Sequence, residues 1–218
     1  MKVTLVSKTL PLVAESLTPE EFVVYTARVS NPTNQMNTET APKLIKFLIK
    51  YKHWSPFEMV DFCFEIQTSR AIAAQILRHR SANFQEFSQR YAQSTAVEEF
   101  EPRLQDNKNR QNSFEIDPAS GEYGLTKKLV DQHFQATFAL YEKLLEQGIA
   151  KESARMVLPM ATQTTLYMKN NLRNWIHYVD LRSEQGTQKE HRMIALEIKR
   201  ILTEECPNVA LACGWREE

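Results

Sequence analysis

Hydrophobic and polar positions along the chain predict a few short strands set among longer helices. The clearest strand is 59–68, where apolar side chains occupy every second position and polar or small ones lie between them. Residues 2–6 alternate in the same way, and the threonine-rich run 162–168 has the composition of a strand. A further short strand is predicted near 84–91.

Amphipathic spacing and capping signals predict the helices. Thr18-Pro19-Glu20-Glu21 is a capping box with proline at the first helical position, so a helix is expected to begin there. Ser69 is placed to cap a second helix. The predicted helices cover 19–29, 40–52, 70–79, 124–147, 150–158, 170–182 and 187–205, and the polar run 104–120 is expected to be a mobile surface excursion.

The order of these elements predicts the fold class. Helices dominate, and the strands do not follow βαβ alternation. This indicates an α+β fold with a mostly antiparallel sheet, not a doubly wound α/β fold. No linker, internal repeat or low-complexity stretch divides the chain, so residues 1–218 are expected to form a single domain.

Charge and hydropathy narrow the classes of function. The 218 residues include 27 Lys and Arg and 27 Asp and Glu, and this balance argues against a protein that coats nucleic acid or binds a membrane surface. No apolar stretch has the length of a transmembrane helix and the N-terminus does not resemble a signal peptide, so a cytoplasmic location is expected. The 3 cysteines form no CxxC pair and the 5 histidines no HxxxH pair, which indicates neither a disulfide framework nor a metal site.

Glycine is scarce, with 5 in the chain and none before Gly121. Phosphate loops of P-loop proteins and of dinucleotide-binding βαβ units use glycine to bring backbone close to phosphate. The chain therefore lacks those loops, and any nucleotide that it binds must be held mainly by side chains.

The densest group of polar residues is 75–91 (QILRHRSANFQEFSQRY). Its first cluster, Arg78-His79-Arg80, ends a predicted helix. Cations at that position can simply interact with the helix dipole and the last carbonyl groups. The cluster alone does not distinguish this structural role from ligand binding.

A second polar cluster in the same segment favours a ligand. Glu86, Ser88 and Arg90 alternate and would share one face of the predicted strand. Arginine forks bind phosphate through two hydrogen bonds, and hydroxyl groups add further donors. The segment therefore predicts an anion pocket for a nucleotide or a similar phosphorylated ligand.

The same segment resembles a known family. Arg78-His79-Arg80, followed after seven residues by Ser88, is similar to the signature of the flavin-dependent thymidylate synthases. The resemblance extends from about residue 20 to residue 205, through further segments in the family's order: Ala27-Arg28-Val29-Ser30, His53-x-Ser55-Pro56-Phe57-Glu58, Glu152-x-x-Arg155-x-x-Leu158-Pro159 and Asn171-x-Arg173 with His177 and Arg182. The chain departs from the family at Ser183–Gln188, where members often carry a histidine.

The resemblance implies a flavin site and the fold of that family. FAD would be the cofactor, with NADPH and 5,10-methylenetetrahydrofolate as co-substrates. The segment Ala27–Ser30 would lie near the flavin, and His53 near flavin and folate. The residues implied in FAD binding are Ser55, Arg78, His79, Arg80, Glu86, Asn171, Arg173 and His177.

The resemblance also implies a site for deoxyuridylate (dUMP). Its implied residues are Gln75, Arg78, Glu86, Ser88, Gln89, Arg90, Arg155 and Arg182. Arg90 and Arg155 suit the phosphate. Arg182 is similar to the arginine that meets the pyrimidine and favours ionisation at N3, which makes it the expected catalytic residue. Family members are homotetramers with active sites shared between subunits, and the same assembly is expected here.

The implied reaction is the reductive methylation of dUMP to thymidylate (dTMP) without a protein nucleophile. Reduced flavin would supply the hydride and the folate the carbon. Ser88 is the nucleophile candidate by position, but nothing in the sequence places a base to activate it, so it is assigned to substrate binding.

Two alternatives remain open. Phe84, Phe87 and Tyr91 lie among the cations of 75–91 and could stack on bases, as in a nucleic-acid-binding module, although the zero net charge argues against it. The same pocket could also serve another flavoenzyme, such as an NADPH oxidase that transfers no methyl group.

Overall fold

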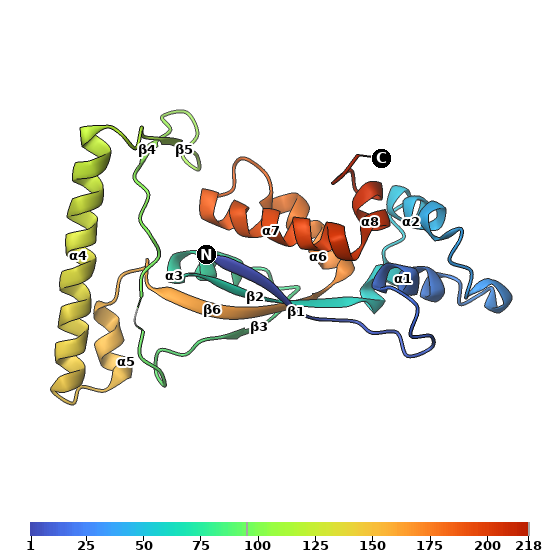
Figure 1. The fold of residues 1–218 in the computed structure, drawn as a ribbon, viewed down its shortest axis with the longest axis horizontal. Helices are drawn as coiled ribbons and strands as arrows, with labels where there is room; N and C mark the ends of the chain where they lie inside the picture. The colour runs from blue at the N-terminus through green and yellow to red at the C-terminus, as the bar shows by residue number, and fades with distance from the viewer. Residues whose placement is uncertain (95, 218) are drawn as a thin grey trace.

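A four-stranded antiparallel sheet forms the centre of the molecule. The computed structural model describes residues 1–94 and 96–217, so Thr95 and Glu218 of the predicted domain lie outside the described residues. Across the sheet the strands are β1 (Lys2–Lys8), β2 (Asp61–Ser69), β6 (Gln163–Asn171) and β3 (Asn83–Glu86) (Figure 1). β2 and β6 pair along their whole length, from Asp61 opposite Asn171 to Ser69 opposite Gln163.

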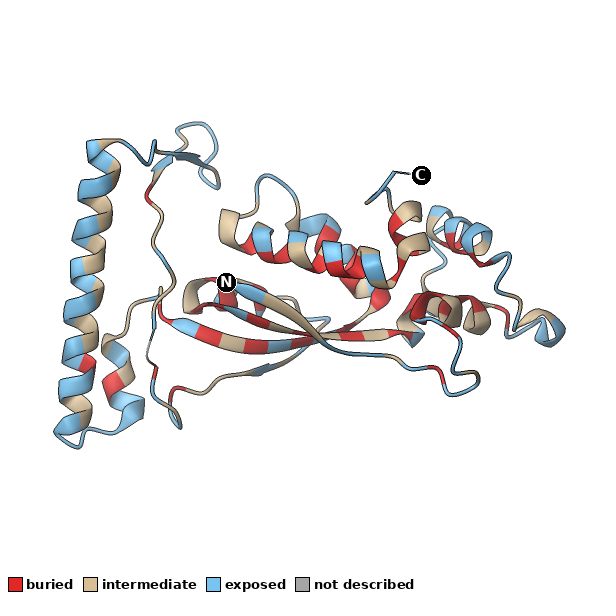
Figure 2. Cartoon of the chain, viewed as in Figure 1, coloured by how far each residue is buried: buried red, intermediate tan, exposed pale blue. Residues whose placement is uncertain are grey.

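One face of this sheet carries the hydrophobic core. The alternation in β2 places Phe62, Phe64 and Ile66 on that face, each fully buried. They lie beneath a layer of helices made of α3 (Arg70–Ile76), α6 (Leu172–Arg182) and α7 (Lys189–Glu205), and buried residues concentrate between the two layers (Figure 2). Trp175 of α6 packs edge-on against Phe64, with ring centroids 4.9 Å apart, and donates a hydrogen bond to the Phe62 carbonyl at 3.1 Å.

A second group of helices lies at the end of the sheet where β2 begins. It contains α1 (Pro19–Ala27), α2 (Ala41–Lys50) and α8 (Pro207–Ala212), with 3-10 helices at Pro32–Asn34 and Ser55–Met59 (Figure 1). The predicted capping box at Thr18 is present. Buried Glu20 of α1 accepts hydrogen bonds from the backbone N–H groups of Asn208 and Val209, at 2.9 and 3.1 Å, and so anchors the start of α8.

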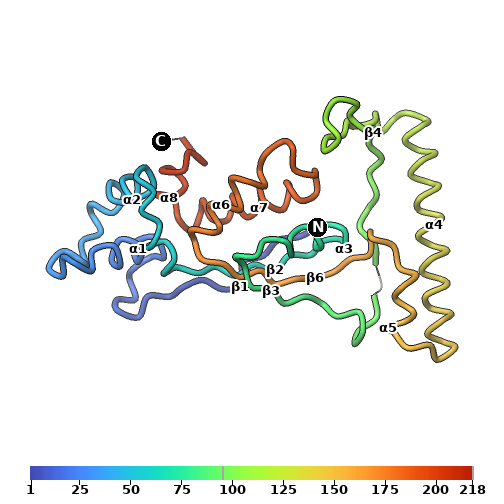
Figure 3. The backbone as a smooth tube through the Cα atoms, turned by 180° about the vertical axis from the view of Figure 1, so that it is seen from behind, coloured from blue at the N-terminus to red at the C-terminus, as the bar shows by residue number. Residues whose placement is uncertain are grey.

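The remaining segment lies beyond the opposite end of the sheet. It contains β4 (Arg103–Gln105), β5 (Ser113–Glu115), α4 (Gly121–Glu146), α5 (Lys151–Ala154) and a 3-10 helix at Arg155–Val157. Both views of the backbone show α4 and α5 side by side, away from the layer of α6 and α7 (Figure 3). All of α4 is described, and Tyr141 is its one buried residue, so most of this long helix is exposed (Figure 2).

The predicted α+β class and antiparallel sheet are confirmed, and two local predictions are wrong. The strand predicted near 84–91 ends at Glu86, because the chain turns at Ser88, whose carbonyl accepts the backbone N–H groups of Tyr91 and Ala92. The run 104–120 is on the surface but contains the β4–β5 hairpin, which side chains of α7 hold in place. The short helix α8, which follows Pro207, was not predicted.

Candidate active site

A polar cluster lies where the C-terminal ends of α3 and α6 meet the first turn of α7. The Arg182 Nε donates a hydrogen bond to Nε2 of His79 at 2.9 Å. The His79 ring packs edge-on against Tyr178, with centroids 4.8 Å apart, and the Tyr178 hydroxyl lies 3.0 Å from Nε2 of His191. Nδ1 of His191 lies 3.3 Å from Oε1 of Gln75. The core therefore brings together residues 103 and 116 positions apart in the sequence.

Both imidazoles of this cluster are neutral at physiological pH. Burial, together with the nearby charges of Arg182 and His177, lowers the pKa of His79 to about 4. Burial likewise lowers the pKa of His191 to about 3, with Arg182 and His79 contributing. Since Arg182 donates to Nε2 of His79, this nitrogen carries the lone pair and the ring proton of His79 lies on Nδ1.

The contact with His79 leaves the two terminal amines of the Arg182 guanidinium free among the described residues. Only its Nε takes part in a hydrogen bond, and within residues 1–94 and 96–217 neither terminal amine of its guanidinium has a hydrogen bond or an ion pair. A guanidinium held at Nε presents its two terminal amines as a fork. Arg182 is thus oriented to bind a carbonyl or anionic group of a ligand.

A second candidate site lies near the first residue of β6. A cavity of about 310 Å³ is lined by Arg70, Gln89, Arg155, Met156, Leu158, Pro159 and Met160. In the part of the chain that the structure describes, the Arg155 side chain has no hydrogen bond or ion pair. Arg70 donates to Oε1 of Glu86 at 2.7 Å, and the Thr164 hydroxyl donates to the same oxygen at 3.0 Å. Glu86 therefore neutralises Arg70 and leaves Arg155 as the unpaired cation of the cavity.

A third set of predicted residues surrounds the start of α6. The Asn171 side chain caps the helix by accepting the backbone N–H of Asn174 at 3.0 Å. Arg173 pairs with Glu58 of the 3-10 helix that Ser55 begins. His177 lies one turn after Arg173 on the same exposed face, as their spacing predicts.

A larger cavity, of about 490 Å³, adjoins the segment Ala27–Ser30. Its lining includes Ser30, Asn31, Lys43 and Phe47. Arg28 also lines it, but its guanidinium donates to the Asn34 and Asn37 carbonyls and to the Thr40 hydroxyl, the last at 2.6 Å. Arg28 thus stabilises the loop 28–40 through these hydrogen bonds. The other residues that line the cavity are therefore the ones available to contact a ligand.

The signature segment 78–90 is arranged differently from its sequence prediction. α3 ends at Ile76, and no side chain of Arg78 or Arg80 bonds to a helix carbonyl in the described residues, so both are exposed cations without a capping role. Ser88 and Arg90 lie after β3 and do not share a strand face with Glu86. The Arg90 Nε forms an ion pair with Oε2 of exposed Glu152 at 3.4 Å. Gln89 is buried, and its Nε2 donates a hydrogen bond to the Ser94 Oγ at 2.9 Å.

The predicted residues do not form one compact site within the chain. Gln89 and Arg155 lie near the first residue of β6, whereas Asn171 ends that strand. At about 3.3 Å per residue, its 9 residues separate the two ends by about 26 Å. The chain therefore carries two partial sites, with the Arg182 cluster on the helices above the sheet.

Some residues of the cluster were missed by sequence reasoning. Tyr178 and His191 have no place in the signature, although both fall on apolar helix faces. His191 shares the buried face of α7 with Ile194, Ala195 and Ile198. A histidine among the apolar positions of a helix indicates a buried polar residue, and this pattern could have identified it from the sequence. Arg70 and Gln188 were missed as well, since only the fold brings them to Glu86 and Gln75.

The described residues hold neither a metal-binding cluster nor a membrane-spanning helix. They contain no cluster of three or more His, Cys, Asp and Glu side chains able to hold a metal ion. No described helix is long and apolar enough to cross a membrane.

Comparison with known proteins identifies the family. Residues 11–208 match the family described as thymidylate synthase complementing protein. The chain is 48% identical over 220 residues to a probable flavin-dependent thymidylate synthase of Paramecium bursaria Chlorella virus 1, covering 99% of this chain and 100% of the relative. It is 49% identical over 222 residues, with the same coverage, to a flavin-dependent thymidylate synthase of Synechocystis.

A solved structure supports the fold independently. The UMP/dUMP methylase PolB from Streptomyces cacaoi, bound with 5-Br dUMP, has a TM-score of 0.80 over 98% of this chain and 94% of its own, at 24% identity. A likeness at 24% identity establishes the fold alone. The two relatives that are 48% and 49% identical to the chain establish the family. The family inferred from the signature is confirmed: the chain belongs to the flavin-dependent thymidylate synthases.

Proposed function

We propose that this chain, as a single catalytic domain, converts dUMP to dTMP with FAD as cofactor. 5,10-Methylenetetrahydrofolate would donate the carbon, and NADPH the reducing equivalents. The observation that carries the proposal is the Arg182–His79 pair, because it joins the expected catalytic arginine to the signature motif and leaves both terminal amines of that arginine free.

The residues present fit a flavin dinucleotide. Arg78 and Arg80 are exposed cations without a protein partner among the described residues, and such cations suit the diphosphate. Ser55, Asn171, Arg173 and His177 form a polar surface around the start of α6 that would hold another part of the cofactor. When bound, reduced flavin supplies a hydride to the pyrimidine.

The nucleotide substrate requires separate contacts for its phosphate and its base. Arg155, unpaired in its cavity, suits the phosphate, and buried Gln89 lines the same cavity. The Arg182 fork would contact the pyrimidine and stabilise negative charge that develops at N3 and its neighbouring carbonyls. Gln75, which contacts His191 in the same polar cluster, would contact the same ring.

Ser88 fits a binding role better than a nucleophilic one. Its Oγ accepts the backbone N–H of Arg90 at 3.4 Å, and the described residues place no histidine, carboxylate or lysine within hydrogen-bond distance of it. A serine without a neighbouring base is a weak nucleophile. The protein would therefore orient and polarise dUMP without bonding to it covalently.

A homotetramer with shared sites would join the separated parts. The Arg155 cavity and the Asn171 surface lie at opposite ends of β6, so one chain cannot bring both to one small ligand. α4 also carries apolar side chains that are largely exposed, with Leu125 at 73% and Leu129 at 69%. Exposed apolar residues along a helix are typical of an interface, which supports self-association.

An anaerobic assay tests the proposed reaction. Protein purified with FAD should be yellow, and incubation with NADPH, methylenetetrahydrofolate and dUMP should form dTMP. Normal flavin reduction without dTMP would overturn the proposal and favour an NADPH oxidase. Arg155→Ala should raise the KM for dUMP about tenfold or more through loss of a phosphate contact. Arg200→Ala is the matched control, because exposed Arg200 pairs with Glu197 and Glu204 of its own helix and, among the described residues, with no other side chain.

A further inference from the structure

His191 is a buried polar residue to which the proposed reaction assigns no role. It is fully buried on the inner face of α7, and both of its ring nitrogens have partners. A histidine that served only as packing could be replaced by an aliphatic residue, as at the neighbouring inward positions of α7. Its two partners, Tyr178 and Gln75, come from two other helices, α6 and α3.

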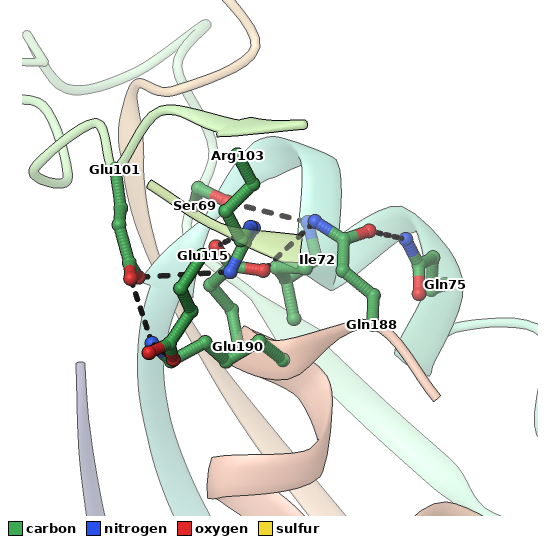
Figure 4. A network of polar contacts seen from close by, with 9 residues as sticks. Ser69, Ile72, Gln75, Glu101, Arg103, Glu115, Gln188 and Glu190 are labelled. Atoms are coloured by element: carbon green, nitrogen blue, oxygen red, sulfur yellow. Dashed lines mark hydrogen bonds and ion pairs between the residues drawn. The ribbon is translucent and has the colours of Figure 1, made fainter. Parts of the chain in front are cut away.

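The direction of every hydrogen bond through His191 follows from one carboxylate. Glu190 can only accept, so Nε2 of Gln188 donates to it, at 2.9 Å. Oε1 of Gln188 then accepts from Nε2 of Gln75 at 2.6 Å (Figure 4). This leaves Oε1 of Gln75 as an acceptor, and its partner, Nδ1 of His191, as the donor.

The tautomer of His191 is thereby determined. A neutral imidazole with its proton on Nδ1 has a lone pair on Nε2, so the Tyr178 hydroxyl is the donor of the 3.0 Å contact. The hydrogen bonds run in one direction, from Tyr178 through His191, Gln75 and Gln188 to Glu190. If the Gln75 amide were reversed, its N–H group would face the N–H of His191, and its oxygen would face the oxygen of Gln188. Both contacts would then be lost.

The fixed amide of Gln75 keeps one N–H and one oxygen lone pair for a ligand. An amide has two N–H groups and two acceptor positions, and the protein uses one of each. A uracil edge alternates carbonyl acceptors with an N–H donor, which complements such a pair. Gln75 is only partly buried, so a ligand can reach it.

We propose that His191 is a positioning residue of the nucleotide site: held by Tyr178, it fixes the oxygen end of the Gln75 amide, whose nitrogen end Gln188 holds, so that the amide meets the pyrimidine of dUMP in one position. This inference rests on the proposed function, because it requires dUMP to contact Gln75. His191 itself touches no ligand and acts through Gln75.

Steady-state kinetics of the holoenzyme with two substitutions test the proposal. His191→Leu places an apolar side chain of similar size there and removes both hydrogen bonds, so the oxygen end of the Gln75 amide loses its partner and only Gln188 still holds the amide. The KM for dUMP should rise about tenfold, equivalent to about 1.4 kcal/mol, with kcat and FAD binding little changed. His191→Asn places an amide N–H near the position of Nδ1 and should bring the KM back to within about threefold of the native value.

A matched control separates positioning from stability. Ile194→Ala, on the same buried face of α7, should lower the midpoint of unfolding and leave the KM unchanged. An unaltered KM in His191→Leu, or an equal rise in His191→Asn, would overturn the inference while the proposed function stands. Native protein that forms no dTMP would instead overturn the proposed function, and this inference with it.

A second variant covers the case in which His191→Leu does not fold. Tyr178→Phe removes the hydroxyl that holds the His191 ring through Nε2, and it should raise the KM for dUMP severalfold. If His191→Leu folds, a double-mutant cycle can be completed. Tyr178→Phe should then cause no further rise in the KM for dUMP when it is added to His191→Leu. A Tyr178→Phe protein with the native KM would count against the proposal.

Discussion

The Nε of Arg182 donates to Nε2 of His79 at 2.9 Å, across 103 residues of sequence. The bond links the end of α6 to the signature segment after α3. It gives His79 a role as the acceptor that orients Arg182, besides the flavin contact inferred from the family. A protonated His79 could not accept this bond, so the low pKa of its ring, about 4, preserves the geometry at physiological pH.

Arg182→Ala should abolish turnover and leave flavin binding intact. Loss of a fixed cation next to developing charge costs about a hundredfold or more in kcat. Because Arg182 contacts His79 through Nε alone, its removal should not unfold the cluster. The rate of dTMP formation and the flavin absorbance of the purified variant provide the two measurements. Turnover near the native rate would show that Arg182 is not the catalytic arginine.

Ser88→Ala should retain a substantial part of the turnover. The Oγ has no base among its described neighbours, so its loss removes at most a binding contact, with a cost of about 0.5–1.5 kcal/mol. The measurement is kcat and the KM for dUMP in the same anaerobic assay. Complete loss of turnover with intact dUMP binding would revive a nucleophilic serine.

The free energy of unfolding should fall as the pH drops below about 6.5. Burial lowers the pKa of His191 from 6.5 to about 3 and that of His79 from 6.5 to about 4. Between these values the unfolded chain binds protons that the folded chain does not, so acid favours unfolding, and above pH 6.5 the effect vanishes.

Urea unfolding at a series of pH values measures this effect. His191→Leu should flatten the dependence below pH 6.5, because one of the two histidines no longer contributes. His133→Asn, an exposed histidine of α4, serves as the control and should leave the slope as in the native protein. Identical slopes in the native and His191→Leu proteins would contradict the buried neutral state of His191.

The β4–β5 hairpin should loosen when its ion pairs to α7 are removed. Arg103 pairs with Glu190 (Figure 4). Lys189 donates to Glu101 and to Glu115, at 2.7 Å in each case. The Arg103 side chain is only 14% exposed, so its pair should be stronger than a surface pair.

Hydrogen exchange of the hairpin amides provides the test. Arg103→Ala should speed exchange in β4 and β5 by about tenfold, consistent with a local loss of about 1.4 kcal/mol. Arg200→Ala, which removes exposed pairs within α7, should leave the hairpin unchanged. Equal exchange in the native and Arg103→Ala proteins would mean that backbone pairing alone holds the hairpin.

Local structure was largely predictable from the sequence. The alternation of 59–68, the capping box at Thr18 and the Ser69 cap each act over a few residues, so the residue pattern alone determines them. The signature around Arg78–Arg80 also identified the family, since its residue types and spacing recur whatever the packing.

The partners of the candidate site residues depended on the fold. Ser88 and Arg90 left the predicted strand face because a turn at Ser88 ended the alternation, and Glu86 met Arg70 through the pairing of β3 with β6. In the same way, the packing of α6 and α7 on the sheet set His79 against Arg182 and His191 against Gln75. Residue patterns specify helices and strands over a few positions. Contacts between residues a hundred positions apart arise only when the apolar faces of those elements pack together. Packing therefore decided which nitrogen of each histidine faces which partner.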